Sequence, residues 1–323
     1  MLIGLVKESK KRVEATFADK RISYICPGCE ADVRLAKGRI RRPYFGHRPG
    51  ATCSYGAFES WEHQQAKEDF AAAYRGRGFA CEIEAEVLSG AGDRRADVLL
   101  HPLKGDYAIA IEVQHSPLDY TALEVRTAAY FECKTPVIWV PILQRKRLDA
   151  VQRIEGTDIF YVGQYGTPAW QTWLHDLHGQ LWFYDPVSRG LWRARLDACM
   201  SYKNPTSYFA DGQEQSGGGY WYESSRWDSL FLEGPYSLAS ARIHRVKLQR
   251  RKRRSYVLPA GIAADFLIEG DPVNYRLPAK LAVAKVEHGQ FNFYRVEHIR
   301  DDQWHPARLE PVSLPEAIVK LNF

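Results

Sequence analysis

DYAIAIEVQHS, residues 106–116, combines the apolar pattern of a buried strand with acid and amide side chains at its end. Four apolar residues, 108–111, come first, then Glu112 and, two positions later, Gln114. Because successive side chains of a strand point to opposite faces, Glu112 and Gln114 share one face and Val113 takes the other. A carboxylate and an amide on one face of so apolar a strand indicate a binding role.

Asp97 lies in the middle of the preceding strand-like stretch, RRADVLLHPL (94–103). A hairpin turn at KGD (104–106) would bring Asp97 beside Glu112. Two carboxylates on one sheet face are costly to bury unless a positive charge joins them, and Mg2+ or Mn2+ prefers such oxygen ligands. The pair therefore predicts a divalent metal site. The alternative is a strand end open to water, with Asp97 paired to a nearby arginine: Arg94, Arg95 or Arg126.

The order of elements around these strands predicts an α/β core. A helix-like stretch rich in alanine, ESWEHQQAKEDFAAAYRGRGF (59–79), precedes a first strand, FACEIEAEV (79–87). The two strands described above follow. Then come a second helix, PLDYTALEVRTAAYFE (117–132), and a buried strand, TPVIWVPIL (135–143).

The first helix carries a set of ionisable residues. Glu59, His63 and Lys67 recur at a spacing of four and therefore share one face, with Glu62 at its edge. Taken alone, this pattern fits a solvated helix face with charge pairs.

Three cysteines and a histidine near the start form a metal-ligand pattern, C-x2-C-x17-H-x5-C. Its members are Cys26, Cys29, His47 and Cys53. Two thiolates of a CxxC turn can bind one ion, and a second pair completes a tetrahedron. A closed set of four ligands predicts structural zinc, because no position is left for a substrate. The alternative is a buried thiol pair beside an unrelated histidine.

Composition is that of a globular protein, with 45% hydrophobic and 26% charged residues. No apolar run approaches the roughly 20 residues needed to cross a bilayer, and the apolar start of the chain is too short for a signal peptide. We therefore expect a cytoplasmic protein without a membrane partner.

Positive charge is concentrated in two stretches that contain no acid, 34–48 and 241–256. Such stretches suit a phosphate-backbone partner, and the alternative is a solvated surface. In the second half, Tyr220, Trp221, Tyr222 and Trp227 could stack on unpaired bases, but we expect most of them to be core residues.

The chain divides into five expected parts. These are a zinc-binding segment (1–57), an α/β core (58–165), an aromatic hairpin extension (166–202), a polar, glycine-rich linker (203–219) and a β-containing accessory domain (220–323).

The motifs described above occur in a recognisable order. CPGC with YFGH, ESWEHQQAK, RRADV, IAIEVQHSPLDYTALEVRTAAY and VIWV together resemble the competence protein CoiA-like family. The pattern D-x14-E-x-Q resembles the PD-(D/E)xK restriction-endonuclease-like superfamily. The resemblance covers about residues 1–145 and extends weakly through 180–196. It implies a mixed sheet flanked by helices, a zinc-binding N-terminus and a nuclease domain.

The resemblance also implies roles for individual residues. Asp97 and Glu112 match the acids that hold Mg2+ or Mn2+, and Gln114 takes the place usually held by lysine. On the helix, Glu62 or Glu59 matches the carboxylate, and His63 and Lys67 match the helix pattern. The charge that glutamine lacks could come from Lys67, which we favour, or from Lys104 or His115. Arg126 and Tyr130 could contact a substrate or brace Glu112, and we favour bracing.

The leading hypothesis is therefore a metal-dependent nuclease acting on DNA, single-stranded DNA included, in competence, recombination or phage defence. A second is a nucleic-acid-binding accessory protein whose catalysis is weak or lost. A third is a zinc-stabilised protein-interaction module in a DNA-processing or defence assembly, with its basic stretches facing acidic protein partners.

Overall fold

The structure is a computed structural model. It describes residues 1–39, 42–53, 55, 59–90, 94–103, 105–148, 151–154, 156–210, 213–253, 256–268, 281–287, 290–295, 305–307 and 309–311, with backbone only for 210 and from 281 onward. Lys104 lies outside this set, as do residues 40–41 and 254–255 of the two basic stretches. In these ranges no helix is both long enough and apolar enough to span a membrane.

The N-terminal unit is a five-stranded antiparallel sheet in the order β2-β1-β3-β4-β5. Its strands are β1 (Ile3–Val6), β2 (Arg12–Glu14), β3 (Tyr24–Ile25), β4 (Asp32–Ala36) and β5 (Tyr44–His47). Its buried cluster is small and includes Tyr24, Cys26 and Phe45. So small a core gives the unit little apolar stabilisation of its own.

The central sheet has four strands in the order β6-β7-β8-β9. They are β6 (Ala80–Val87), β7 (Arg94–His101), β8 (Ile109–Gln114) and β9 (Val137–Pro141). The first three are antiparallel, whereas β8 and β9 are parallel. A parallel pair needs a crossover, which α2 (Tyr120–Glu132) supplies. Together with α1 (Trp61–Gly76), this arrangement confirms the predicted mixed α/β fold.

Each face of the central sheet packs against one helix. Phe70 and Tyr74 of α1 share a buried cluster with Ile111 and Val113 of β8. Tyr130 of α2 belongs to the cluster on the opposite face. The alternation along β8 therefore places Val113 toward α1 and Glu112 toward α2.

A second sheet has six strands in the order β12-β13-β16-β11-β10-β24. Its strands are β10 (Gln152–Ile154), β11 (Ile159–Tyr165), β12 (Leu181–Asp185), β13 (Gly190–Lys203), β16 (Tyr220–Tyr236) and β24 (Leu309–Pro311). The predicted hairpin is present as β12–β13. Since β11 pairs with β16, the expected boundaries at 165 and 220 both cut through this sheet. Two other helices lie nearby, η1 (Arg145–Arg147) and α3 (Ala169–His178).

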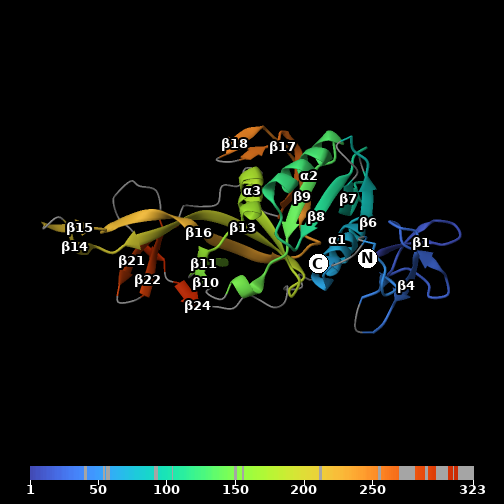
Figure 1. The fold of residues 1–323 in the computed structure, drawn as a ribbon, viewed down its shortest axis with the longest axis horizontal. Coiled ribbons are helices and arrows are strands. Elements are labelled where there is room, and N and C mark those ends of the chain that lie inside the picture. Colours follow the sequence, from blue (N-terminus) through green and yellow to red (C-terminus); the bar gives the residue numbers. More distant parts are fainter. Residues whose placement is uncertain are drawn as a thin grey trace.

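The structure contradicts the expectation of a linker at 203–219. These residues contain β14 (Thr206–Ala210) and β15 (Gln213–Gly217), which pair with each other. They continue the ladder in which Lys203 pairs with Tyr220. Glycines 218 and 219 adopt positive φ angles of 90° and 72°, which lets a glycine-rich stretch turn within the hairpin. We call residues 200–223 the arm, and Figure 1 shows it projecting from one end of the molecule, with the N-terminal unit at the other.

The remaining strands form two pairs, β17 with β20 and β18 with β19, and a three-stranded sheet in the order β21-β22-β23. They are β17 (Arg242–Leu248), β18 (Arg251–Arg253), β19 (Tyr256–Leu258), β20 (Gly261–Leu267), β21 (Leu281–Glu287), β22 (Gln290–Arg295) and β23 (His305–Ala307). Phe266 of β20 stacks on Phe70 of α1 with ring centroids 6.0 Å apart. Trp182 Nε1 donates to Asp265 at 2.7 Å. Part of the expected accessory domain therefore packs on the central core.

Candidate functional site

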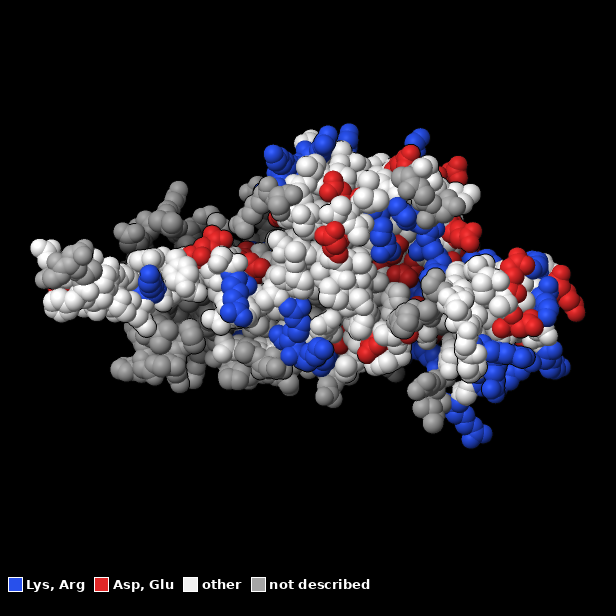
Figure 2. Space-filling model, in the orientation of Figure 1, with Lys and Arg blue, Asp and Glu red and all other residues white. Residues whose placement is uncertain are grey.

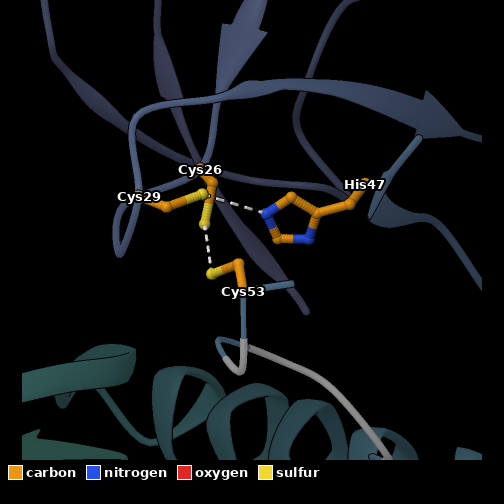
Figure 3. Close-up of side chains that lie close together, drawn as sticks. All are labelled: Cys26, Cys29, His47 and Cys53. Atoms are coloured by element: carbon orange, nitrogen blue, oxygen red, sulfur yellow. Dashed lines mark hydrogen bonds between the residues drawn. The ribbon is translucent and has the colours of Figure 1, made fainter. Parts of the chain in front are cut away.

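The four predicted metal ligands of the N-terminal unit come together (Figure 3). Cys26 and Cys29 lie in the turn between β3 and β4, His47 ends β5, and Cys53 follows it. Their ligand atoms all lie within 4.8 Å of one another. The Sγ atoms of Cys26 and Cys53 are 3.9 Å apart, and Cys29 Sγ is 3.4 Å from His47 Nε2.

These distances fit a tetrahedral metal. Bonds of about 2.3 Å to sulfur and about 2.0 Å to nitrogen place two sulfurs about 3.8 Å apart and sulfur and nitrogen about 3.5 Å apart. Backbone N–H groups of Gly28 and Tyr55 donate to the sulfurs of Cys26 and Cys53, each at 3.3 Å. A Cβ added to Gly28 would lie 2.7 Å from the Tyr55 ring, so the turn requires glycine there.

Asp97 and Glu112 lie at the same end of neighbouring strands of the central sheet. The ladder of β7 and β8 ends at the pair of Val98 with Ile111, and Asp97 and Glu112 are the adjoining residues of the two strands. Val113 N–H donates to Asp97 Oδ2 at 2.9 Å, which fixes the aspartate against β8. The expectation that the two carboxylates share one sheet face is not met, because α1 contacts Asp97 and α2, on the opposite face, contacts Glu112.

Asp97 faces α1. His63 Nε2 lies 3.0 Å from its Oδ2 and Lys67 Nζ lies 4.0 Å from its Oδ1. Burial alone would raise the pKa of Asp97, but the charge and hydrogen bond of His63, with the charge of Lys67, hold it below its usual value. Burial would lower the pKa of His63, but Asp97 and Glu59 raise it to about 9. The imidazole is therefore a cation at neutral pH.

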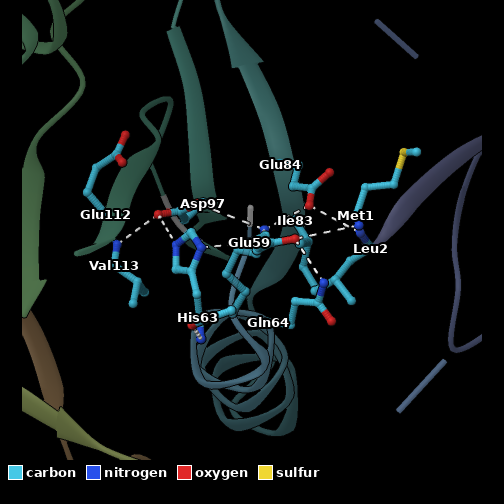
Figure 4. A network of polar contacts seen from close by, with 12 residues as sticks. Met1, Leu2, Glu59, His63, Gln64, Ile83, Glu84, Asp97, Glu112 and Val113 are labelled. Carbon is cyan, nitrogen blue, oxygen red and sulfur yellow. Dashed lines mark hydrogen bonds and ion pairs between the residues drawn. The ribbon is translucent and has the colours of Figure 1, made fainter. Parts of the chain in front are cut away.

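Glu59, rather than Glu62, is the helix-side carboxylate of this cluster (Figure 4). It precedes the N-cap Ser60, and its Oε1 contacts Lys67 Nζ and lies 3.3 Å from His63 Nδ1. His63 and Lys67, through their hydrogen bonds and charges, lower the pKa of Glu59 despite its burial. The spacing of four in the sequence thus describes one cluster, with its residues buried rather than solvated.

Glu112 is contacted from α2, and Figure 4 shows its side chain pointing away from His63. Its Oε2 accepts from Arg126 at 2.7 Å, and its Oε1 accepts a short hydrogen bond from the Tyr130 hydroxyl. Its side chain is 2% exposed, and burial raises its pKa to about 7, with a contribution from the charge of Asp97 and opposition from Arg126. Arg126 and Tyr130 therefore brace Glu112, as expected.

The other two predicted site residues, Gln114 and Glu62, do not belong to this cluster. Gln114 is buried at the end of β8, and its Nε2 donates to Ser116 O. Glu62 lines a cleft of about 360 Å3 with Trp61 and His115, so the structure does not bring it to Asp97. The cleft opens where β8 and β9 end, next to Gln114.

Sequence reasoning missed Glu84 on β6. Its Oε1 lies 2.7 Å from Lys67 Nζ, so it belongs to the cluster of Glu59, His63 and Asp97. The strand reads CEIEAEV, in which Glu82, Glu84 and Glu86 alternate as one polar face would. Nothing in that pattern distinguishes the buried middle member from its exposed neighbours.

The basic stretches are only partly available to a partner. Arg42 is paired with Glu68 at 2.5 Å and with Asp69 at 3.0 Å, which ties it to α1. Arg251 donates to backbone carbonyl groups at the end of α3. Other lysines and arginines remain on the surface, and Figure 2 shows them gathered along one edge of the N-terminal unit.

The aromatic residues of the second half are more exposed than expected. Tyr220 and Tyr222 are 51% and 46% exposed, so they are not core residues, whereas Trp221 and Trp227 are half-buried. Tyr202, Tyr208 and Phe209 are also exposed on the arm.

Comparison with known proteins gives two family matches. Residues 7–56 match the competence protein CoiA N-terminal domain, and residues 59–214 match the competence protein CoiA nuclease-like domain. No curated protein and no solved structure matches the chain. The first segment contains all four Cys and His ligands, and the second contains the whole cluster around Asp97.

Proposed function

Because the chain belongs to the competence protein CoiA family, we propose that it is a metal-dependent nuclease that hydrolyses DNA phosphodiester bonds. The observation that carries this proposal is that Asp97 and Glu112 adjoin the last pair of the β7–β8 ladder, inside the segment that matches the nuclease-like domain. We place the activity in DNA processing for competence or recombination, or in phage defence.

Asp97 and Glu112 would hold the divalent ion. Among the described residues, the hydrogen bonds of Asp97 use Oδ2, so Oδ1 remains for a metal, and the side chain is 15% exposed. Each oxygen of Glu112 accepts one hydrogen bond and has a second lone pair. Bound Mg2+ or Mn2+ would polarise a phosphoryl oxygen and lower the pKa of a coordinated water.

The remaining side chains would bind and orient the substrate. The ammonium group of Lys67, supplied from α1, offsets the negative charge that develops on the phosphate, in place of the lysine that Gln114 replaces. The amide donor of Gln114 is engaged by Ser116, so its carbonyl oxygen is the atom that would orient an attacking water. Glu59 and Asp97 hold His63 between them.

Zinc in the N-terminal unit would have a structural role. All four positions of a tetrahedron are taken by Cys26, Cys29, His47 and Cys53, so no position remains for a substrate. We propose that the ion stabilises a unit whose apolar core is small.

DNA, including single strands, is the proposed partner. Basic side chains at the edge of the N-terminal unit suit phosphates, and the exposed aromatic residues of the arm suit unpaired bases. A phosphate contact weakens steeply with added salt, because binding releases counterions from DNA. Binding measured at several salt concentrations therefore separates this partner from an acidic protein surface.

One observation favours a second function, a nucleic-acid-binding protein with little or no catalysis. Both oxygens of Glu112 are engaged by Arg126 and Tyr130, and the Gln114 amide is engaged by Ser116. A site satisfied in this way by its own side chains needs no metal to compensate its charge.

The test is a cleavage assay on linear, circular and single-stranded DNA with Mg2+, Mn2+ or EDTA. Wild type should cleave with a metal and not with EDTA, and Asp97→Asn and Glu112→Ala should each lose most of that activity. Glu86→Ala, an exposed acid on the neighbouring strand, is the matched control and should cleave normally. Equal activity of wild type and Glu112→Ala would reject the nuclease, and retained DNA binding would then favour the second function.

A further inference from the structure

Glu84 has a backbone conformation that strands do not normally contain. Its φ is +54°, in the left-handed region that disfavours residues other than glycine. The pairs on either side, Ile83 with Val98 and Ala85 with Ala96, keep their register, so the distortion is confined to this residue. By the same register Glu84 lies opposite Asp97. Local strain of this kind persists where the surrounding structure enforces it, and it gathers at functional sites.

The Glu84 carboxylate is buried without being fully satisfied. The residue is 1% exposed, and its Oε1 takes the contact with Lys67 and a hydrogen bond from Leu2 N–H at 3.1 Å. Its Oε2 is buried with no hydrogen-bond partner among the described residues. An unpaired buried oxygen costs free energy, as does the strained backbone, so stability alone does not explain a glutamate here.

The N-terminal unit holds this distorted residue in place. The Arg12 guanidinium of β2 donates to the carbonyl oxygens of Ile83 at 2.7 Å and of Glu84 at 3.2 Å. Leu2, beside β1, donates to the Glu84 side chain. Backbone and side chain of Glu84 are therefore both fixed by the unit that carries the Cys and His cluster.

Lys67 lies where these contacts meet. It is almost completely buried, and its ammonium group contacts Glu59 and Glu84 and lies 4.0 Å from Asp97. Without Glu84, the Lys67 side chain would keep Glu59 as its one close acidic partner. It could then turn along α1, away from Asp97. The two carboxylates that hold the ammonium group come from different segments, Glu59 from the residue before the N-cap of α1 and Glu84 from β6.

We propose that Glu84 is a positioning residue of the nuclease site: held by Arg12 and Leu2 of the N-terminal unit, it fixes the Lys67 ammonium group beside Asp97, where the scissile phosphate binds. This inference rests on the proposed nuclease function. It makes the N-terminal unit a part of the active site as well as a neighbouring module.

A double-mutant cycle on cleavage tests the proposal. Glu84→Gln keeps the shape of the side chain and an acceptor for Leu2, and should lower kcat by about 10- to 100-fold with KM changed less than about twofold. Glu84→Asp keeps the charge and should restore part of the loss. If Glu84 acts through Lys67, the double variant Glu84→Gln with Lys67→Gln should cleave no more slowly than Lys67→Gln alone. Glu86→Gln is the matched control.

Thermal unfolding of the same variants separates positioning from folding. The Tm loss of the double variant should be smaller than the sum of the two single losses, because each single change removes one of the opposite charges that compensate a buried charge. If wild type cleaves and Glu84→Gln cleaves as fast, or if the kcat losses of the two single variants multiply in the double, the positioning role is wrong while the nuclease assignment stands. If wild type does not cleave under any condition, both are wrong, whatever the unfolding data show.

Discussion

Replacement of Cys29 by serine should release the metal of the N-terminal unit and unfold that unit. Cys29 is exposed, so the change removes almost no packing, and any large effect must come from the lost ligand. Cys133, a half-buried thiol outside the cluster, offers the matched control, because serine there can keep its hydrogen bond to Leu88 O.

The effect of Cys29→Ser should be large because the apolar core of the N-terminal unit is small. Its buried cluster consists of six residues, two of them alanine: Met1, Ala15, Ala18, Tyr24, Cys26 and Phe45. Structural zinc contributes about 10–16 kcal/mol to the folding of small zinc-binding domains. One ligand of four then accounts for about 3 kcal/mol, which is a loss of zinc affinity of about 100-fold or more.

The assay is competition for zinc against a chromogenic chelator, with limited proteolysis to follow folding of residues 1–53. Wild type and Cys133→Ser should each bind one zinc per chain and resist cleavage in this segment, whereas Cys29→Ser should do neither. Zinc affinity of Cys29→Ser within about twofold of wild type would refute the reasoning, as would equal losses in the two variants. Since Arg12 and Leu2 hold Glu84, we also expect Cys29→Ser to cleave DNA more slowly.

Three further predictions concern other parts of the molecule. Tyr130→Phe removes a hydroxyl donor from the buried Glu112 carboxylate and should lower the free energy of unfolding in urea by about 1.5–3 kcal/mol; an unchanged midpoint would contradict the bracing role. Burial lowers the pKa of His175 in the folded protein. Below about pH 6.5 the unfolded state therefore binds more protons than the folded state, and the free energy of unfolding should fall by up to about 1.4 kcal/mol for each pH unit. Above that pH the neutral His175 makes its full contribution to stability. His175→Gln should reduce this slope between pH 7 and 5.5, and an identical slope would show that other groups dominate. Phe209→Ser, at a position 78% exposed on the arm, should leave unfolding unchanged within about 0.5 kcal/mol but weaken single-stranded DNA binding by about 1–3 kcal/mol; unchanged binding would remove the arm from the DNA contact.

Much of the site could be predicted because its signals are local. The spacing of Cys26, Cys29, His47 and Cys53 predicted a set of metal ligands, since a CxxC turn presents two thiolates by its own geometry, and the structure brings the four ligand atoms within 4.8 Å of one another. The turn signal between 94–103 and 106–116 predicted the hairpin that brings Asp97 beside Glu112, and β7 pairs with β8 as that hairpin requires. The mixed α/β core followed from the order of helices and strands.

The extended hairpin at 203–219 shows where local signals mislead. Glycine and polar residues indicate a flexible linker, and the same composition also suits turns and exposed strands. The structure makes it an arm because β13 and β16 pair on either side and carry their register into it. The pairing of this stretch depends on the strands that flank it, and the composition of the stretch itself gives no information about them.

The sequence by itself predicted the Cys and His set of the N-terminal unit, the strand pair that bears Asp97 and Glu112, and the shared side of Glu59, His63 and Lys67, because short-range spacing specifies each of them. Only the tertiary structure decided which charges meet. It joined Glu84 to Lys67, turned Glu112 toward α2 and separated Glu62 from the cluster. The partner of a buried charge depends on which elements pack together, and the chain acquires those neighbours only when it folds.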